Sequence, residues 1–295
     1  MSWFDQLVQP GHIAEAVVHI NESRKRMERG HPKTEVSRLL FDALNKVQTE
    51  WVLHLRGEQL GEVRAFQTMI LEGVDEEDRG RFLRSDELKQ LVEFEPQVMN
   101  HQTLRQRGYR PNVELTGHLV REASQEHRKL RTAYDALLLQ REDATEDRVL
   151  ERAAELLYII RSNIAHGEKT PYGPDLEKRE RDEQVSNVVV PVQIVLLDLL
   201  LDRPSQKLFS YGTLAPGQRN HEVVSGLGGS WQTCGAYGQL DDVGGLQVFR
   251  WNPVGPRIKG QLLVSPDLPE RWSQLDQFEG DSYKRRWITV AVDAR

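Results

Sequence analysis

The stretch TEDRVLERAAELLYIIRSNIAHG, residues 145–167, decides the class of the N-terminal part of this chain. Its apolar residues recur every three or four positions, and this spacing places them on one broad face of a helix. Thr145 is a suitable N-cap residue, and acidic residues occupy the first turn after it. Gly167 suits the position that follows a last helical turn. The predicted buried face consists of Val149, Leu150, Ala153, Ala154, Leu157, Ile160 and Ile164.

Helical spacing extends from this stretch over most of residues 1–204. Apolar residues recur at three and four in 12–27, 36–55 and 115–139, and a very apolar helix is predicted at 183–201. Between residues 73 and 111 the pattern is charged and irregular, which indicates a long insertion with a short helix around 85–93. Residues 1–204 are therefore predicted to form an all-α helical bundle.

The character of the chain changes near residue 205. Twelve of the 22 glycines lie beyond Ser205, and the apolar residues begin to alternate or to run in short blocks. These blocks predict strands at 208–211, 236–240, 246–251, 260–264 and 287–292, with a short helix at 269–278 capped by Asp267. Residues 205–295 are predicted to form a small β-barrel-like domain. The whole chain is then an α + (α+β) protein of two domains, which suits its 295 residues.

Composition narrows the class of protein. The 38% of hydrophobic residues is enough for real hydrophobic cores. The 28% of charged residues and the mean hydropathy of −0.58 are typical of a soluble protein with a large polar surface. We expect no membrane span, because Pro191, Gln193 and Asp198 interrupt the most apolar run, and no signal peptide. The single cysteine, Cys234, excludes an internal disulfide and a cysteine-based zinc site. These features predict a cytoplasmic protein with no membrane partner.

The net charge of −6 is unusual for a dedicated nucleic-acid binder. Residues 1–204 carry 29 basic and 36 acidic side chains (−7), and the remainder carries 10 and 9 (+1). An RNA partner would therefore need local basic patches. Candidate clusters lie at 24–29, 79–84 and 105–110, although most such clusters are simply solvated helix faces.

The end of the 145–167 helix carries Arg161 and His166, five positions apart. A guanidinium can bind a phosphate, and an imidazole can transfer a proton near neutral pH. These two functions are what metal-free cleavage of a phosphodiester requires. No metal or other cofactor is needed for this chemistry. On spacing alone the alternative is more common: an Arg and a His at a helix C-terminus often only cap carbonyls and interact with the helix dipole.

The string from Ile159 to Lys169 resembles the R-x4-6-H signature of the HEPN superfamily, in its Arg-x-Asn-x-x-His-Gly-x-Lys form. The resemblance implies a helical bundle that forms a homodimer with a composite active site, commonly a metal-independent endoribonuclease of toxin or defence type. It would make RNA the partner, with Arg161 binding the phosphate and His166 transferring a proton. Asn163 would order the loop or hold the scissile group. Ser162 departs from the larger polar residue of many members.

A second pattern lies in the C-terminal part. Residues 209–214 form an apolar strand that runs into a glycine turn, where freed backbone N–H groups can bind an anion such as a carboxylate. Residues 275–286 place Glu279 at the end of a short helix, where it could act as a general acid and base. The alternative is an ordinary exposed glutamate that pairs with Lys284 or Arg286.

Together these two strings resemble the gamma-glutamylcyclotransferase-like (AIG2-like) family, in Tyr-Gly-Thr-Leu and in Leu-Asp-x-x-Glu-Gly followed by Tyr283-x-Arg285. The resemblance implies that Glu279 shuttles a proton while the α-amine of a γ-glutamyl ligand attacks its γ-carbonyl, with release of 5-oxoproline. The family usually continues into at least one further strand, so three alternatives stay open: the domain is minimal, the chain is cut before its last strand, or a partner supplies that strand. The implied substrate-binding residues are Tyr211, Gly212, Thr213 and Leu214.

The sequence thus supports three hypotheses. The main one is a dimeric, metal-independent endoribonuclease whose C-terminal domain senses, modifies or regulates. The first alternative is a gamma-glutamylamine cyclotransferase that a non-catalytic helical domain dimerises. The second alternative is a non-enzymatic, ligand-responsive interaction protein.

Overall fold

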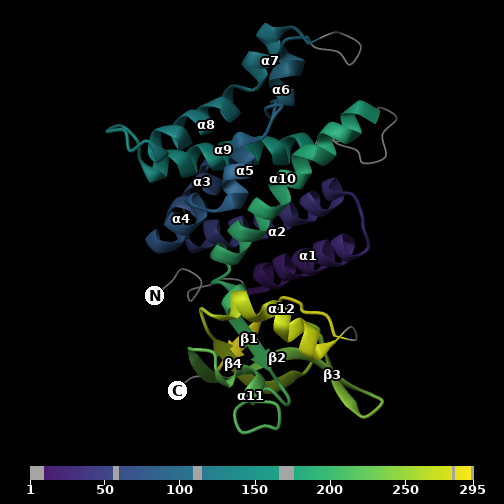
Figure 1. The fold of residues 1–295 in the computed structure, drawn as a ribbon. Helices are drawn as coiled ribbons and strands as arrows, with labels where there is room; N and C mark the ends of the chain where they lie inside the picture. The colour runs from purple at the N-terminus through teal and green to yellow at the C-terminus, as the bar shows by residue number, and fades with distance from the viewer. Residues whose placement is uncertain (1–9, 56–59, 109–114, 166–175, 281–282, 294–295) are drawn as a thin grey trace. The chain divides into compact units, whose positions relative to one another are not determined.

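In a computed structural model of the protein, the chain divides into two compact units, Met1–Leu200 and Leu201–Arg295 (Figure 1). The structure describes residues 10–55, 60–108, 115–165, 176–280 and 283–293. The division falls at residue 200, whereas the sequence placed the boundary at residue 204.

The first unit is helical, which confirms the class predicted for it. Two predicted helices differ in detail from the structure. The predicted helix at 115–139 is divided in two at Ser124, and the predicted helix at 183–201 begins earlier, at residue 176. The helices are α1 (Pro10–Glu28), α2 (Lys33–His54), α3 (Glu62–Glu72), α4 (Glu76–Leu83), α5 (Asp86–Glu93), α6 (His101–Gln106), α7 (Gly117–Ala123), α8 (Gln125–Leu138), α9 (Glu146–Ala165) and α10 (Leu176–Leu200).

Helix α9 lies in the core of this unit. Its cap is the one predicted, because the backbone N–H of Arg148 donates to Thr145 Oγ1 at 3.2 Å. All seven apolar residues predicted to face the core are buried. They pack among α2, α3, α4 and α8, so α9 has helices on several sides (Figure 1).

The region 73–111, predicted as an irregular insertion with a short helix around 85–93, contains that helix as α5 and two further short helices, α4 and α6, that were not predicted. Each begins with a side-chain cap from Asp75, Ser85 or Asn100. Helices α4 and α5 bury Phe82, Leu88 and other apolar residues in the core. With eight and six residues, α4 and α6 are too short to show a helical period against their many charges.

Helix α2 has no capping side chain of its own, because Pro32 occupies its N-cap position. Glu183 of α10 supplies the cap from 150 residues away. Its carboxylate accepts from the backbone N–H of Lys33 at 2.6 Å and from the N–H and hydroxyl of Thr34 at 3.2 and 3.0 Å. A carboxylate at a helix N-terminus is also favoured by the helix dipole, so this contact joins α10 to α2.

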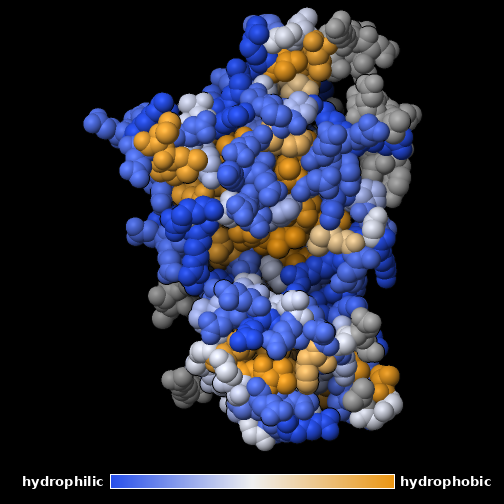
Figure 2. Space-filling view, viewed as in Figure 1, coloured by the Kyte–Doolittle hydropathy of each residue, from blue (hydrophilic) through white to orange (hydrophobic). Residues whose placement is uncertain are grey.

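Among the described residues one helical segment, Arg179–Leu200 of α10, is long and apolar enough to cross a membrane by length and composition alone. This corrects the expectation that no run is long enough, since α10 continues through Pro191. Half of its most apolar window is buried inside the protein, against α2 and other helices. Figure 2 shows apolar residues over α2 and α10 between charged neighbours. Burial in a helical core explains such a helix, so its composition is weak evidence for a membrane.

In its described residues the second unit is a five-stranded antiparallel sheet with two α-helices and one short 3-10 helix. Its strand order is β1-β4-β2-β3, and β5 pairs with the first half of β2 on the side opposite β4. The sheet is open, so the predicted barrel is wrong. The elements are η2 (Pro204–Gln206), β1 (Lys207–Ser210), α11 (Glu222–Ser225), β2 (Ser230–Val243), β3 (Leu246–Trp251), β4 (Arg257–Val264), α12 (Leu268–Glu279) and β5 (Val290–Val292).

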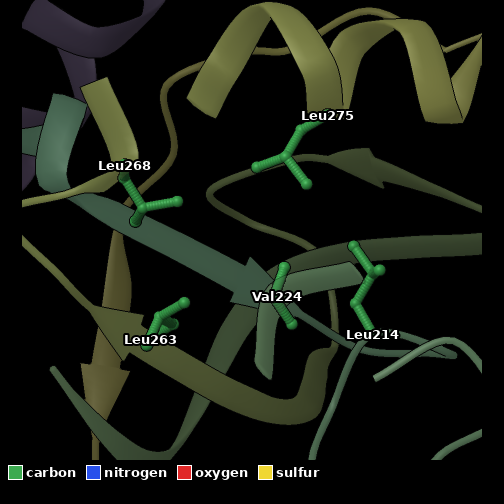
Figure 3. Close-up of a cluster of buried hydrophobic side chains, with 5 residues drawn as sticks. All are labelled: Leu214, Val224, Leu263, Leu268 and Leu275. Atoms are coloured by element: carbon green, nitrogen blue, oxygen red, sulfur yellow. The ribbon is translucent and has the colours of Figure 1, made fainter. Parts of the chain in front are cut away.

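One face of the sheet packs on the two helices. The register aligns Leu208, Leu263 and Trp231 across β1, β4 and β2, and alternation places all three on the same face. Leu268 and Leu275 of α12 cover this face, together with Leu214 and Val224 (Figure 3). Asp267, predicted to cap α12, makes no capping bond; its carboxylate accepts instead from the N–H of Gly228 at 2.9 Å.

Candidate active site

The loop after β1 presents a row of backbone N–H groups. The carbonyls of Thr213 and Leu214 are held by Asn220 and His221, whose N and Nδ1 atoms lie 3.0 Å from them. The N–H groups of Gly212, Thr213 and Leu214 have no hydrogen-bond partner among the described residues. Gly212 is exposed, and a Cβ atom added to it would meet nothing within 4 Å. The loop therefore offers an open set of donors of the kind that binds anions.

The side chain of Tyr211 is already engaged in the fold. Its hydroxyl accepts from the N–H of Phe249 at 3.1 Å and donates to the carbonyl of Gln247 at 3.2 Å. Its ring lies 5.4 Å from that of Phe249, and burial raises the pKa of its hydroxyl. Tyr211 thus ties the end of β1 to the free edge of β3 by one side chain. A closed barrel would need a strand ladder there, and the described strands form none between β1 and β3.

The other predicted binding side chains are also occupied. The hydroxyl of Thr213 accepts from Asn220 Nδ2 at 3.0 Å, and the side chain of Leu214 is buried in the core. Of the predicted substrate-binding residues 211–214, the backbone, the open side of Gly212 and the hydroxyl hydrogen of Thr213 remain for a ligand. This distinction could not be made from the motif alone.

Glu279 ends α12 with an exposed carboxyl. The surrounding protein still desolvates it enough to raise its pKa. Its negative charge in turn raises the pKa of Tyr211, so the two groups lie within electrostatic reach of each other. Within the described part of the chain the carboxylate forms no ion pair with Lys284, Arg286 or any other cation. Glu279 is therefore a carboxyl with a raised pKa and no fixed partner.

The described segment that begins at Tyr283 is held against α12 by Arg285. Gly280 has φ 73°, a conformation that favours glycine, and this residue lets the chain reverse at the helix end. The guanidinium of Arg285 then lies 4.5 Å above the ring of Trp272 and 3.2 Å from Asp276. Arg285 therefore positions the return segment and, through it, the end of α12.

In the helical unit, Arg161 lies near the end of α9 with its guanidinium partly exposed. Nη1 of Arg161 is 3.4 Å from the carboxylate of Glu62, which also accepts from the hydroxyl of Tyr158 at 2.9 Å. The guanidinium lies 5.3 Å from the centre of the Tyr158 ring. The sequence indicated neither Glu62 nor Tyr158 as part of this site. His166 and Gly167 lie outside the described residues, so the predicted Arg161–His166 pair is not placed.

Asn163 is buried, and both ends of its amide are hydrogen-bonded. Its Nδ2 donates to the carbonyl of Met99 at 2.9 Å, and its Oδ1 accepts from the N–H of His101 at 3.2 Å. Of the two roles predicted for it, this geometry supports the ordering of a segment.

Two further side chains that the sequence did not indicate hold the same segment. His127 accepts from the N–H of Val98 at 2.8 Å and donates to the carbonyl of Val92 at 3.1 Å. Arg181 donates to the carbonyl of Gln97 at 2.7 Å. Burial lowers the pKa of both His127 and Arg181.

A polar cavity of about 370 Å³ opens beside this segment, with Asn100, Arg107, Glu122 and Gln125 in its lining. It contains none of the predicted site residues.

In the described part of the chain no three His, Cys, Asp or Glu side chains gather as metal ligands would. Cys234 is buried, and its burial raises the pKa of the thiol to about 11.

The small antiparallel sheet thus carries a loop with unbonded backbone donors and, at the end of α12, a carboxyl with a raised pKa. Residues 208–295 match the family model described as gamma-glutamyl cyclotransferase, AIG2-like. The C-terminal domain is therefore AIG2-like, which confirms that part of the predicted resemblance. The match leaves the helical unit uncovered, and no match to the HEPN superfamily supports that unit. No curated protein and no solved structure matches the chain.

Proposed function

We propose that the C-terminal domain is a cyclotransferase that acts on γ-glutamyl amides. The observation that carries the proposal is the family match over residues 208–295, which includes both the open loop and Glu279. This reverses the order of the hypotheses from sequence, because the match supports the cyclotransferase alternative rather than the ribonuclease.

In the proposed reaction the N–H groups of Gly212, Thr213 and Leu214 bind the α-carboxylate of the substrate. The α-amine attacks the γ-carbonyl carbon, a new C–N bond forms, and the bond to the leaving amine breaks. Glu279 accepts the proton that the α-amine loses and returns it to the leaving amine. The products are 5-oxoproline and the free amine, and no water is consumed.

The raised pKa of Glu279 supports this role. A carboxyl that must both accept and return a proton works best when its pKa approaches the working pH. The lack of an ion pair at Glu279 also leaves its carboxylate available to a substrate.

The test is release of 5-oxoproline from a panel of γ-glutamyl amides of simple amines and amino acids, measured by chromatography. Glu279→Gln keeps the shape of the side chain and should lower the rate about 10²- to 10⁴-fold. Glu270→Gln is the matched control, since Glu270 lies in the first turn of the same helix, and should leave the rate unchanged. No 5-oxoproline from the wild-type protein, or full activity in Glu279→Gln, would refute the proposal.

A second candidate is metal-independent RNA cleavage by the helical unit, as a homodimer in the cytoplasm. The observation in its favour is that Arg161 sits on a buried helix, with a partly exposed guanidinium suited to a phosphate. In this proposal His166 transfers the proton, and the C-terminal domain senses a ligand or regulates cleavage. RNA cleavage in EDTA, lost in His166→Ala, would support it. Cleavage that persists in the variant, or a monomeric wild-type protein, would reject it.

A further inference from the structure

Two donors on α9 converge on one carboxylate. The hydroxyl of Tyr158 and the guanidinium of Arg161 both contact Oε2 of Glu62, at 2.9 and 3.4 Å. These residues lie one helical turn apart, so they face the same side of α9, and the guanidinium also contacts the Tyr158 ring. The three residues come from parts of the chain almost 100 positions apart. No part of the cyclotransferase site uses them.

The contact is weak for a structural ion pair. The Glu62 side chain is 67% exposed and that of Arg161 is 26% exposed. An ion pair this open contributes little to stability, because water competes for both charges. The Tyr158 hydrogen bond and the Arg161 charge lower the pKa of Glu62, so the group held there is an anion.

The two partners are not equally fixed. Tyr158 and Arg161 belong to a helix whose opposite face is buried, which holds their backbone in place. Glu62 is the first residue of α3, and its carboxylate has no other recorded partner in the described part of the chain. The donors are therefore preformed, whereas the carboxylate that they bind is exposed to exchange.

We propose that Tyr158 and Arg161 form a binding site for a phosphate-class oxyanion, and that Glu62 occupies this site as an internal competitor. A guanidinium and a phenol together match the donors that phosphate oxygens accept. Nε and Nη2 of Arg161 have no recorded partner among the described residues, so an incoming phosphate can gain bonds that Glu62 does not make. The inference shares Arg161 with the second candidate function but requires no cleavage.

The test measures binding rather than cleavage. One arm titrates inorganic phosphate and follows it by ³¹P NMR, and the other titrates a short fluorescent single-stranded RNA and follows its polarisation. Glu62→Gln should bind about three- to tenfold more tightly than the wild type, since an exposed carboxylate competitor is removed. A gain in both arms would assign the site to phosphodiesters, and a gain with phosphate alone would assign it to small phosphates.

The matched control is Glu76→Gln, because Glu76 is an exposed glutamate at the same first position of the next helix. It changes the net charge equally and should leave binding as in the wild type. Adding Tyr158→Phe or Arg161→Gln to Glu62→Gln should cancel the gain. Equal binding by Glu62→Gln and Glu76→Gln, or a gain that survives the loss of Arg161, would overturn the proposal. Lower thermal stability of Glu62→Gln with unchanged binding would also overturn it, since the contact would then be only structural.

Discussion

The two candidate sites differ in how far their polar groups are already occupied. In the C-terminal unit, three backbone N–H groups of residues 212–214 and the carboxylate of Glu279 have no partner among the described residues. In the helical unit, Asn163 makes two buried hydrogen bonds and Arg161 shares a carboxylate with Tyr158. A motif specifies residue types, but it does not show how much of their bonding capacity the fold consumes. Open groups, and donors held only by an exposed competitor such as Glu62, indicate a ligand site, whereas a buried group bonded within the fold, such as Asn163, indicates a structural role.

The largest effect on stability should come from Asn163, which is buried and hydrogen-bonded at both ends of its amide. Asn163→Ala leaves the carbonyl of Met99 and the N–H of His101 without their partner in a buried place. The free energy of unfolding of the helical unit should fall by about 2–3 kcal/mol. Urea unfolding followed by far-UV circular dichroism measures it. Asn45→Ala, a half-buried position on α2, should cost less than about 0.5 kcal/mol. Equal losses in the two variants would break the comparison.

Tyr211→Phe tests a motif residue that lies beside the unbonded N–H groups of 212–214 but whose own hydroxyl is already hydrogen-bonded within the fold. Loss of the hydroxyl removes its bonds to Phe249 and Gln247, and should lower stability by about 1–2 kcal/mol. The rate of 5-oxoproline release should change only a few-fold, because the hydroxyl is not available to a substrate. Tryptophan fluorescence during urea unfolding reports on this unit through Trp231, Trp251, Trp272 and Trp287. A large loss of activity at unchanged stability would make Tyr211 a binding side chain after all.

The stability of the helical unit should fall with decreasing pH because of His127. Burial lowers the pKa of His127 in the folded helical unit below its ordinary value of 6.5. The unfolded chain then takes up the proton first, so this contribution is complete above about pH 6.5 and is lost as the pH falls towards the folded pKa. Unfolding of the wild type and of His127→Gln, measured from pH 7.5 to 5, should show a steeper decline in the wild type. Parallel curves would show that His127 is not held neutral.

The smallest predicted effect is a shift in a pH–rate profile. Desolvation raises the pKa of Glu279 above the ordinary 4.5, and the proposed reaction needs its unprotonated form to accept the first proton. The acid limb of kcat/KM for 5-oxoproline release should therefore have its midpoint above pH 4.5. A midpoint at or below that value would mean that Glu279 is as open to water as any surface carboxyl.

Much of the fold followed from local patterns. The apolar face of α9, its Thr145 cap and the change to short strands after Ser205 all appear in the structure. Short or interrupted elements could not be predicted from local patterns. Helices α4 and α6 are too brief for a period, and the break between α7 and α8 at Ser124 lies inside continuous helical spacing. The open sheet was also missed, because strand pattern does not specify whether the first and last strands pair.

The sequence by itself determined the two-part character of the protein, the position of the Tyr211–Leu214 loop and the place of Glu279 at the end of a short helix, whereas the acid–base role of Glu279 came from the family resemblance. These features depend on residues close in the chain, where spacing and turn chemistry act directly. Only the tertiary structure decided which polar groups are filled. Glu62 reaches Arg161 across 99 positions, Glu183 caps α2 across 150, and Tyr211 reaches β3 across 38. These partners meet because whole helices and strands pack together, so a local sequence pattern cannot predict them.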